Sequence, residues 1–185
     1  MKKMIAMLLA LTLVFGLAAC GGNNVPATEA PTEAPTEAAK HVEGTMEELV
    51  NKVMEKQPVE FMGGLMPVDL SDTSEDGLWA IKSFTGLDSA EQISDVAVFE
   101  PMMGSIPFSL VMVRANEGAD VKAVAEGMKT NIDQRKWICV EADDLQVVSF
   151  GDVVMLIMVG SDTGMTSQAY VDAFAEVCGD EVTVH

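Results

Sequence analysis

The chain has 185 residues, and its 29 acidic side chains against 11 basic ones give a formal net charge of −18 at pH 7. A surface this acidic repels nucleic acid, anionic lipid and anionic wall polymers, which excludes nucleic acid as a partner. Cations or basic protein faces are easier partners, unless the charge serves solubility alone. The length suits one domain, and no run long enough to span a membrane follows the first twenty residues.

The N-terminus has the layout of an export signal. Two lysines precede an apolar run, residues 4–19, that ends in small residues directly before Cys20. The sequence Leu-Ala-Ala-Cys resembles the lipobox of bacterial lipoproteins, which implies cleavage after residue 19 and acylation of Cys20. Two or three acyl chains give a stable anchor where one does not. We therefore expect residues 1–19 to be a signal peptide, and the exported protein to be lipid-anchored through Cys20 at the outer face of the bacterial cytoplasmic membrane.

A low-complexity segment follows the cysteine. Residues 27–38 read Ala-Thr-Glu-Ala, Pro-Thr-Glu-Ala, Pro-Thr-Glu-Ala. Such a composition cannot bury enough surface to offset the entropy lost on ordering, and its prolines favour extended chain. The sequence therefore predicts a tether over residues 20–44 and a single globular domain over residues 45–185.

Two helices are predicted at the start of this domain. Residues 45–48 (TMEE) match a capping box, and apolar residues at helical spacing follow until a proline ends the helix. Residues 61–67 (FMGGLMP) are predicted as a loop. A second helix is expected to start at a cap on Ser71 or Thr73 and to end near Gly86.

The second half of the chain repeats one order of elements, strand, strand, helix. Strands are predicted at residues 95–100, 108–114, 145–150 and 153–159, with one helix from residue 121 and another after residue 161. The prediction is an α+β fold with a four-stranded antiparallel sheet, in β-β-α-β-β-α order, behind the two N-terminal helices.

The strand at 153–159 (VVMLIMV) is apolar throughout, so both faces of the sheet should be covered. We expect the two later helices on one face. The two N-terminal helices would cover the other, or that face would be a dimer or partner surface. The similar stretches at 110–113 (LVMV) and 156–159 (LIMV) leave a duplicated unit open.

The stretches DVAVF (95–99), 121–135 and 153–159 resemble an uncharacterised family of small Gram-positive bacterial lipoproteins, classed only as a domain of unknown function. The resemblance begins near residue 87 and covers about half the chain. It implies a lipobox, a low-complexity tether and one domain with this order of elements. It carries over no functional residue and no cofactor.

Motifs for catalysis are missing from the sequence. Both histidines, His41 and His185, lie at the edges of the predicted domain, where a rigid catalytic shell is rarely supplied. Asp162 begins the Asp-Thr-Gly tripeptide of aspartic proteases, but Gly160-Ser161 precede it in place of an apolar strand. A polar loop that caps the last helix through residues 161–163 is favoured instead. We predict no catalytic residue, no metal site and no cofactor.

Acidic clusters and methionines supply the remaining candidate contacts. The clusters within 69–76 and 141–144 lack the spacing of the twelve-residue calcium loop, so solvated loops are favoured. Thioethers bind cuprous copper, but most methionines here recur at core spacing, and Met102-Met103 falls in a predicted hairpin loop. The weak candidates for ligand or partner contact are Asp72, Glu75, Asp76, Met102 and Met103.

Two cysteines remain in the domain, Cys139 and Cys178. A disulfide between them is allowed outside the membrane and would contribute about 3–4 kcal/mol by closing the intervening loop. A free buried thiol is equally ordinary for Cys178, which lies on the apolar side of a predicted helix. Both alternatives stay open.

Three functions are compatible with these features. A non-enzymatic binding or accessory module, with an envelope protein as partner, fits the anchor and the tether best. A small solute- or cation-binding lipoprotein fits the anchor, but the two-lobed clamp of that class needs about twice this length. A hydrolase built on carboxylates such as Asp162 is the third. The sequence names no ligand, oligomeric state or envelope type.

Overall fold

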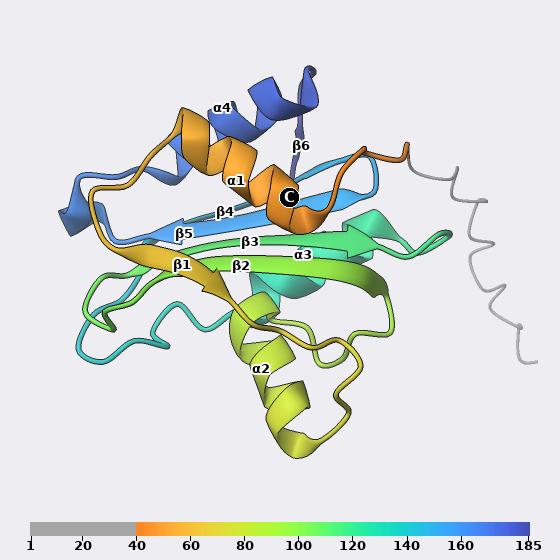
Figure 1. Ribbon diagram of the computed structural model, residues 1–185, viewed down its shortest axis with the longest axis horizontal. Helices are drawn as coiled ribbons and strands as arrows, with labels where there is room; N and C mark the ends of the chain where they lie inside the picture. Colours follow the sequence, from red (N-terminus) through yellow and green to blue (C-terminus); the bar gives the residue numbers. More distant parts are fainter. Residues whose placement is uncertain (1–39) are drawn as a thin grey trace, which may run out of the picture. The chain divides into compact units, whose positions relative to one another are not determined.

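A computed structural model describes residues 40–185 of the chain. This part forms four α-helices and one six-stranded antiparallel sheet with the strand order β1-β2-β3-β5-β4-β6 (Figure 1). The strands are β1 (Gly63–Met66), β2 (Ile93–Pro101), β3 (Phe108–Ala115), β4 (Asp144–Phe150), β5 (Val153–Val159) and β6 (Thr183–Val184). The helices are α1 (Met46–Lys56), α2 (Glu75–Thr85), α3 (Val121–Asn131) and α4 (Ser167–Cys178), with a short 3-10 turn η1 (Ser161–Thr163) before α4.

The predicted α+β class is confirmed, but the predicted sheet is too small. It has six strands rather than four, and the order of elements differs because β1 lies between α1 and α2 and β6 follows α4. None of the helices in residues 40–185 is long and apolar enough to cross a membrane. The predicted signal peptide, Cys20 and the predicted tether up to residue 39 lie outside the described residues.

Helices cover both faces of the sheet, as the uniformly apolar β5 predicts. All seven residues of β5 are buried. The expected division of the helices is wrong, however, because α1 and α4 cover one face while α2 and α3 cover the other (Figure 1). The chain leaves β3 toward one face, where α3 packs beside α2. It leaves β5 toward the opposite face, where α4 packs beside α1.

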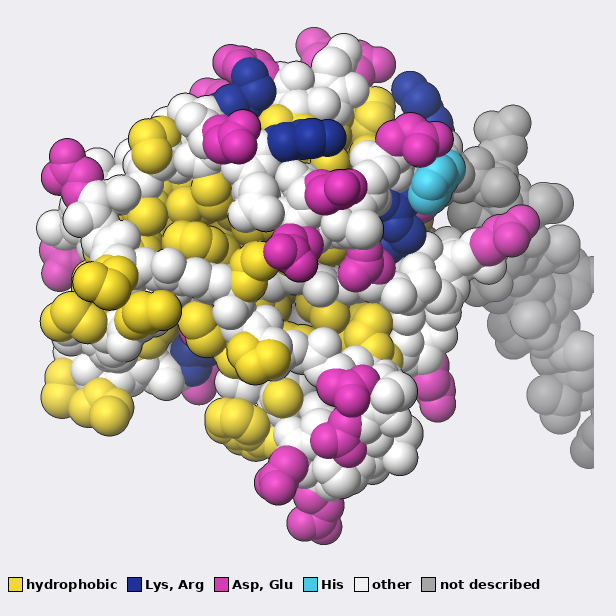
Figure 2. Space-filling model, in the orientation of Figure 1, with side chains coloured by type: hydrophobic (Ala, Val, Ile, Leu, Met, Phe, Trp, Pro, Cys, Tyr) yellow, Lys and Arg dark blue, Asp and Glu magenta, His cyan; other side chains and the backbone are white. Residues whose placement is uncertain are grey.

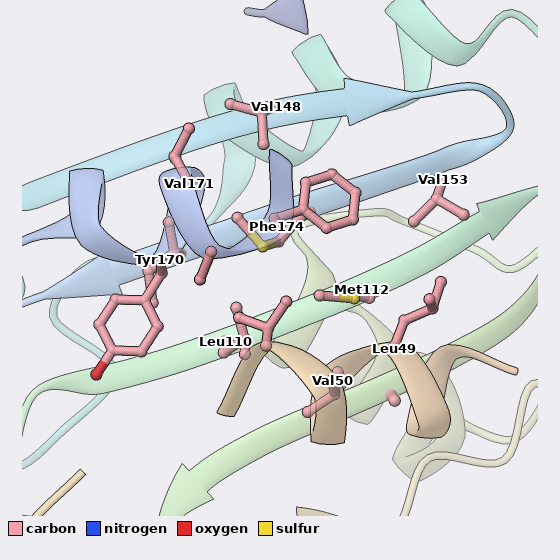
Figure 3. Packing of buried hydrophobic residues seen from close by; sticks show 14 of the residues in the cluster. Leu49, Val50, Leu110, Met112, Val148, Val153, Tyr170, Val171 and Phe174 are labelled. Carbon is pink, nitrogen blue, oxygen red and sulfur yellow. The ribbon is translucent and has the colours of Figure 1, made fainter. Parts of the chain in front are cut away.

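Alternation along the central strands divides the core into two clusters. Leu110 and Met112 of β3 point into the α1/α4 layer, and Val111 and Val113 point into the α2/α3 layer. Figure 3 shows side chains of both α1 and α4 pointing at the first pair, with Phe174 of α4 among them. Full burial of each such side chain contributes roughly 1.5–3 kcal/mol.

The two strand, strand, helix units are not a symmetric repeat. Leu110 and Leu156 hold matching places in the similar stretches LVMV and LIMV, yet they lie in core clusters on opposite faces. Leu110 pairs with Ile157 in the sheet. A two-fold axis perpendicular to the sheet, between the antiparallel strands β3 and β5, would place α3 and α4 on the same face. They lie on opposite faces instead.

The first two helices each begin at a side-chain cap. The capping box of α1 is present, with Thr45 and Glu48 each accepting from the other's amide. The N-cap of α2 is Ser74 rather than Ser71 or Thr73. Gly77 is required inside α2, because a Cβ there would lie 2.3 Å from the carbonyl oxygen of Asp72.

Two short edge strands escaped the sequence analysis. β1 contains the Gly-Gly pair that marks the predicted loop, but Gly63 lies so close to Phe99 that a Cβ would be 2.8 Å from the ring. Glycine therefore allows this strand to pair with β2, where a side chain would be excluded. β6 has only two residues and pairs with Val148 and Ser149 of β4.

Candidate functional site

The two ends of the sheet carry different groups. Ser109 lies at the start of β3 and Arg114 near its end, roughly 17 Å apart at about 3.3 Å per residue. We call the end that holds Ser109 and the β2–β3 loop the distal end. The other end holds Arg114 and the turn between β4 and β5, and we call it the entry end because the described chain begins there (Figure 1).

The entry end fastens the first described residues to the sheet. Asp152 accepts hydrogen bonds from the Val42 amide at 2.9 Å and from Arg114 at 2.7 Å, and its Oδ2 lies 2.7 Å from Nδ1 of His41. Arg114 also donates to the Gly44 carbonyl at 2.5 Å. We call this arrangement the entry clamp. Residues 40–44, placed in the tether by their composition, are therefore bound to the domain.

The charge and the backbone at the entry clamp both suit this fastening. Partial burial alone would raise the pKa of Asp152, but the hydrogen bonds from Val42, Arg114 and His41 lower it below its usual value. Gly151 has φ +57°, and a Cβ there would lie 2.1 Å from the Lys40 carbonyl oxygen. The close approach of the chain thus depends on glycine at this turn.

The distal end holds a nearly buried ion pair. Lys136, in the loop between α3 and β4, lies 2.5 Å from the carboxylate of Glu100 on β2. The Ser109 hydroxyl donates to Glu100 at 2.7 Å, and the Lys136 ammonium is 3.3 Å from both the Ser109 hydroxyl and the Ser83 carbonyl oxygen. Each charge is thus compensated within the protein, as burial requires.

Aromatic rings enclose the ammonium group of this pair. Nζ of Lys136 lies 5.1 Å from the ring centroid of Phe84 and 5.4 Å from that of Trp137. Both distances are within the range of cation–π attraction. Burial lowers the pKa of Lys136, and the neighbouring Glu100 carboxylate opposes that shift.

A hollow of about 500 Å³ opens beside the ion pair, and we call it the Lys136 pocket. Its apolar lining comes from Trp79, Phe84 and Trp137, and its polar lining includes Asn131 and Asp133. The volume falls in the range of small-ligand sites. The chain has two tryptophans, and both line this pocket.

Large hydrophobic side chains are exposed at the distal end. Met102 and Met103 in the β2–β3 loop are 66% and 60% exposed, and Met62 opposite them is also exposed. The Met102 amide donates to the Met62 carbonyl at 2.9 Å, so these two residues are neighbours. In Figure 2 hydrophobic side chains gather on the left, over this end of the sheet, whereas charged side chains surround the right end. The predicted hairpin-loop position of Met102-Met103 is confirmed, and their contact with a partner stays a prediction.

A second hollow opens at the distal end on the other face of the sheet. Its volume is about 580 Å³, and Phe61, Ile106 and Met165 are among its lining residues. It lies beside the C-terminal end of α1 and the turn η1. Both faces of the domain therefore offer concave surface at this end.

The acidic cluster proposed as a weak contact is used within its own loop. Asp72 accepts from the Ser74 amide, and Glu75 and Asp76 occupy the first turn of α2, where acidic side chains favour the helix dipole. Hydrogen bonds from Ser71 lower the pKa of Asp69, and those from Ser74 lower that of Asp72. Across residues 40–185 no group of three or more His, Cys, Asp or Glu side chains could hold a metal ion.

The second acidic cluster supplies the cap that residues 161–163 were expected to provide. Asp144 accepts from both the amide and the hydroxyl of Ser167 at the start of α4. The N-cap residue is Thr166, whose side chain makes no capping hydrogen bond, so the prediction of a cap within 161–163 is wrong. Asp162 lies in η1 and is exposed.

Cys139 and Cys178 are both free thiols in the described part of the chain. Cys139 is exposed in the loop between α3 and β4, whereas Cys178 packs with the α1/α4 layer. Helices α3 and α4 cover opposite faces of the sheet, which leaves the two cysteines in different surroundings. Burial raises the pKa of Cys178 to about 11.

One further polar pair was missed because His185 was judged by its position in the sequence. The pairing of β6 with β4 brings Nε2 of His185 to 2.7 Å from the Ser149 hydroxyl. Burial lowers the pKa of this histidine. Neither residue lines the two distal hollows or the hollow of about 370 Å³ beside Arg114 and Asp152 at the entry end.

The Lys136 pocket was also missed by the sequence analysis. The available signals were Ser109 and Glu100 at the ends of apolar strands and a tryptophan next to Lys136, and none of these forms a known motif. Comparison of the chain with protein-family models, with curated proteins and with solved structures finds no match.

Proposed function

We propose that this chain is a lipid-anchored extracytoplasmic binding module that contacts its ligand or partner through the distal end of its sheet. The lipobox at Cys20, the low-complexity tether and the resemblance to small Gram-positive lipoproteins support the anchor and the compartment. The observation that carries the binding role is the separation of the two ends. Exposed hydrophobic side chains and the Lys136 pocket lie at the distal end, whereas the chain enters the domain at the entry clamp.

The separation matters because of where an anchor would act. A chain held at a membrane through its N-terminal segment is tied to the domain at the entry end, so the distal end is the one free to face outward. Exposed apolar side chains that gather in one region mark interaction surfaces more often than scattered ones do. The net charge of −18 repels anionic lipid and anionic wall polymers and so disfavours these as the partner.

The anchor is tested by labelling cells with a fatty acid that carries an alkyne group. The full chain should take up the label, and Cys20→Ser should lose it. Cys139→Ser is the matched control, because it removes an exposed thiol at another position and should leave the label unchanged. A Cys20→Ser chain that is labelled as strongly as wild type would refute the lipid anchor.

The binding role is tested by photo-crosslinking in intact cells. A benzophenone amino acid is placed at Met103, at the distal end, or at Lys122, in the first turn of α3 close to the entry end. Both side chains are exposed, so both probes are tolerated. We expect adducts with an envelope component from position 103 and none from position 122. Equal adducts from both positions, or none from position 103, would contradict the proposal.

A further inference from the structure

We infer that the Lys136 pocket binds a sugar ring of an uncharged saccharide. The inference rests on the proposed function, because it names a ligand class for one part of the distal end. The pocket combines three properties that a pyranose ring matches: balanced charge, an exposed aromatic face and a rim with both donors and acceptors.

The lining carries equal numbers of cationic and anionic side chains, Lys82 and Lys136 against Glu100 and Asp133. Lys136 is already paired with Glu100, and Lys82 is paired with Asp88 at 2.7 Å. A cationic ligand would meet the Lys136 ammonium at the rings, and an anionic ligand would meet the Glu100 carboxylate beside it. An uncharged ligand avoids both repulsions.

The aromatic lining offers a flat surface that is open to solvent. Trp79 on α2 is 70% exposed, which is unusual for the largest side chain. Trp137 and Phe84, which also line the hollow, are half-buried. A pyranose presents a face of C–H groups that can lie on an indole ring, and it removes apolar surface from water while its edges stay polar.

The polar rim suits hydroxyl groups. A hydroxyl both donates and accepts, and the lining supplies the amide of Asn131, which does both, together with the acceptor Asp133 and the donor Lys82. The ion pair below is held by Ser109 and Ser83 without any ligand. A rim on such a fixed base loses little conformational freedom when a ligand binds, which favours affinity.

The first experiment uses tryptophan fluorescence of the full chain, purified in a polyoxyethylene detergent that has no sugar headgroup. The probes are tetra-N-acetylchitotetraose, cellotetraose and maltotetraose, all uncharged, each titrated to about 10 mM because single-ring contacts are weak. Spermidine, citrate and an uncharged aromatic tripeptide are the comparison probes. Both tryptophans line the pocket, so a ligand there should change the emission saturably.

Substitution then locates the bound sugar. Trp79→Ala removes an exposed ring and should weaken binding about tenfold or more, as loss of an aromatic anchor does. Val184→Ala, at an exposed position on β6, is the control and should bind as wild type does. Because Trp79→Ala also removes a fluorophore, both variants are compared by saturation-transfer NMR of the sugar protons.

Each outcome decides the inference. Saturable binding of a tetrasaccharide that Trp79→Ala weakens and Val184→Ala does not would support it. Binding of spermidine, citrate or the peptide without any sugar would overturn the saccharide class. Sugar binding that Trp79→Ala leaves unchanged would place the sugar elsewhere, and the lack of any response would also overturn the inference. In these last cases the crosslinks from position 103 decide separately whether the distal end is a binding surface.

Discussion

Two ion pairs of similar geometry serve opposite ends of the sheet. Arg114 and Asp152 are 2.7 Å apart with side chains 11% and 14% exposed, and Lys136 and Glu100 are 2.5 Å apart with side chains 10% and 12% exposed. Distance and burial therefore do not tell them apart. Their surroundings do. Arg114 and Asp152 bind backbone groups of residues 42 and 44 and line a hollow of about 370 Å³ that has no Phe, Tyr or Trp among its described lining residues, whereas Lys136 and Glu100 lie among aromatic rings beside the Lys136 pocket.

The role of a buried charge pair follows from the groups around it. At the entry end, the remaining hydrogen-bonding capacity of the pair is used by the main chain of residues 42 and 44, which precede α1. At the distal end, the pair fixes a loop beside a concave surface that is lined by three aromatic side chains. The first arrangement is a fastening and the second is a candidate site.

The largest expected effect comes from breaking the distal pair on one side. Glu100→Gln leaves the Lys136 ammonium nearly buried without a countercharge, which should lower the free energy of unfolding by about 3–5 kcal/mol at pH 7 in urea titrations. The loss should shrink as pH rises. Burial already lowers the pKa of Lys136, so above that pKa the folded state binds fewer protons than the unfolded state and stability increases with pH.

The matched control for this prediction is the double variant Glu100→Gln with Lys136→Met. Removing both charges should restore most of the lost stability, because no buried charge is left unpaired. A double variant that is as unstable as the sum of the two single variants would show that packing, and not charge, is what Glu100 supplies.

The entry clamp should respond to substitution with a smaller loss that is local. Asp152→Ala removes the carboxylate that forms hydrogen bonds with His41, Val42 and Arg114. We expect the free energy of unfolding to fall by about 2–3 kcal/mol. Hydrogen exchange at the Val42 amide should become much faster. Amides of β5 should slow down or speed up only as far as the change in global stability requires. Asp152→Asn keeps an acceptor for Val42 and should lose less. Equal losses in the two variants would argue against the role given to this hydrogen bond.

Glycine at the entry turn allows a sharper comparison between the two ends. Gly151 and Gly164 both have positive φ, but only Gly151 has a neighbour where a Cβ would lie. Gly151→Ala should therefore cost about 1–2 kcal/mol more than Gly164→Ala, which carries the backbone strain alone. Urea titrations of the two variants measure the difference. Equal costs would show that residue 40 is not held against this turn.

The smallest expected effect is in acid. The folded pKa of Asp152 is lowered, so its contribution to stability is present above its unfolded pKa and is lost as pH falls through the folded value. The difference in unfolding free energy between wild type and Asp152→Asn should therefore narrow below about pH 4. Taking the difference removes the contributions of Asp69, Asp72 and Asp143, whose pKa values are also lowered by hydrogen bonds from nearby serines. If this difference stays constant down to low pH, the ionised carboxylate of Asp152 is not what stabilises the entry clamp.

Much of the fold could be predicted from local patterns. The capping box of α1 and the apolar stretches of β3 and β5 depend on residues close together in the chain, and these elements are confirmed. The division of the helices between the faces was wrong because it depends on the direction in which the chain leaves β3 and β5. β1 was missed because its Gly-Gly pair is typical of a loop, and only the ring of Phe99 explains it.

The candidate site could not be predicted because its residues are far apart in the sequence and meet only in the folded chain. Glu100 ends a strand and Lys136 lies in a loop after another helix, and no spacing rule relates them. The exposed Met102-Met103 pair was found because a hairpin loop is a local feature. The cap of α4 was assigned to its neighbours in sequence, whereas Asp144 provides it from the beginning of a strand.

The entry clamp also has a mechanical consequence. A pull on the chain at Lys40 must break the hydrogen bonds of Asp152 and Arg114 before it reaches any strand of the sheet. The segment up to Thr45 would detach first, which withdraws Val42 from the α1/α4 core cluster and lengthens the connection to the domain by those few residues. The sheet and the Lys136 pocket would stay folded meanwhile.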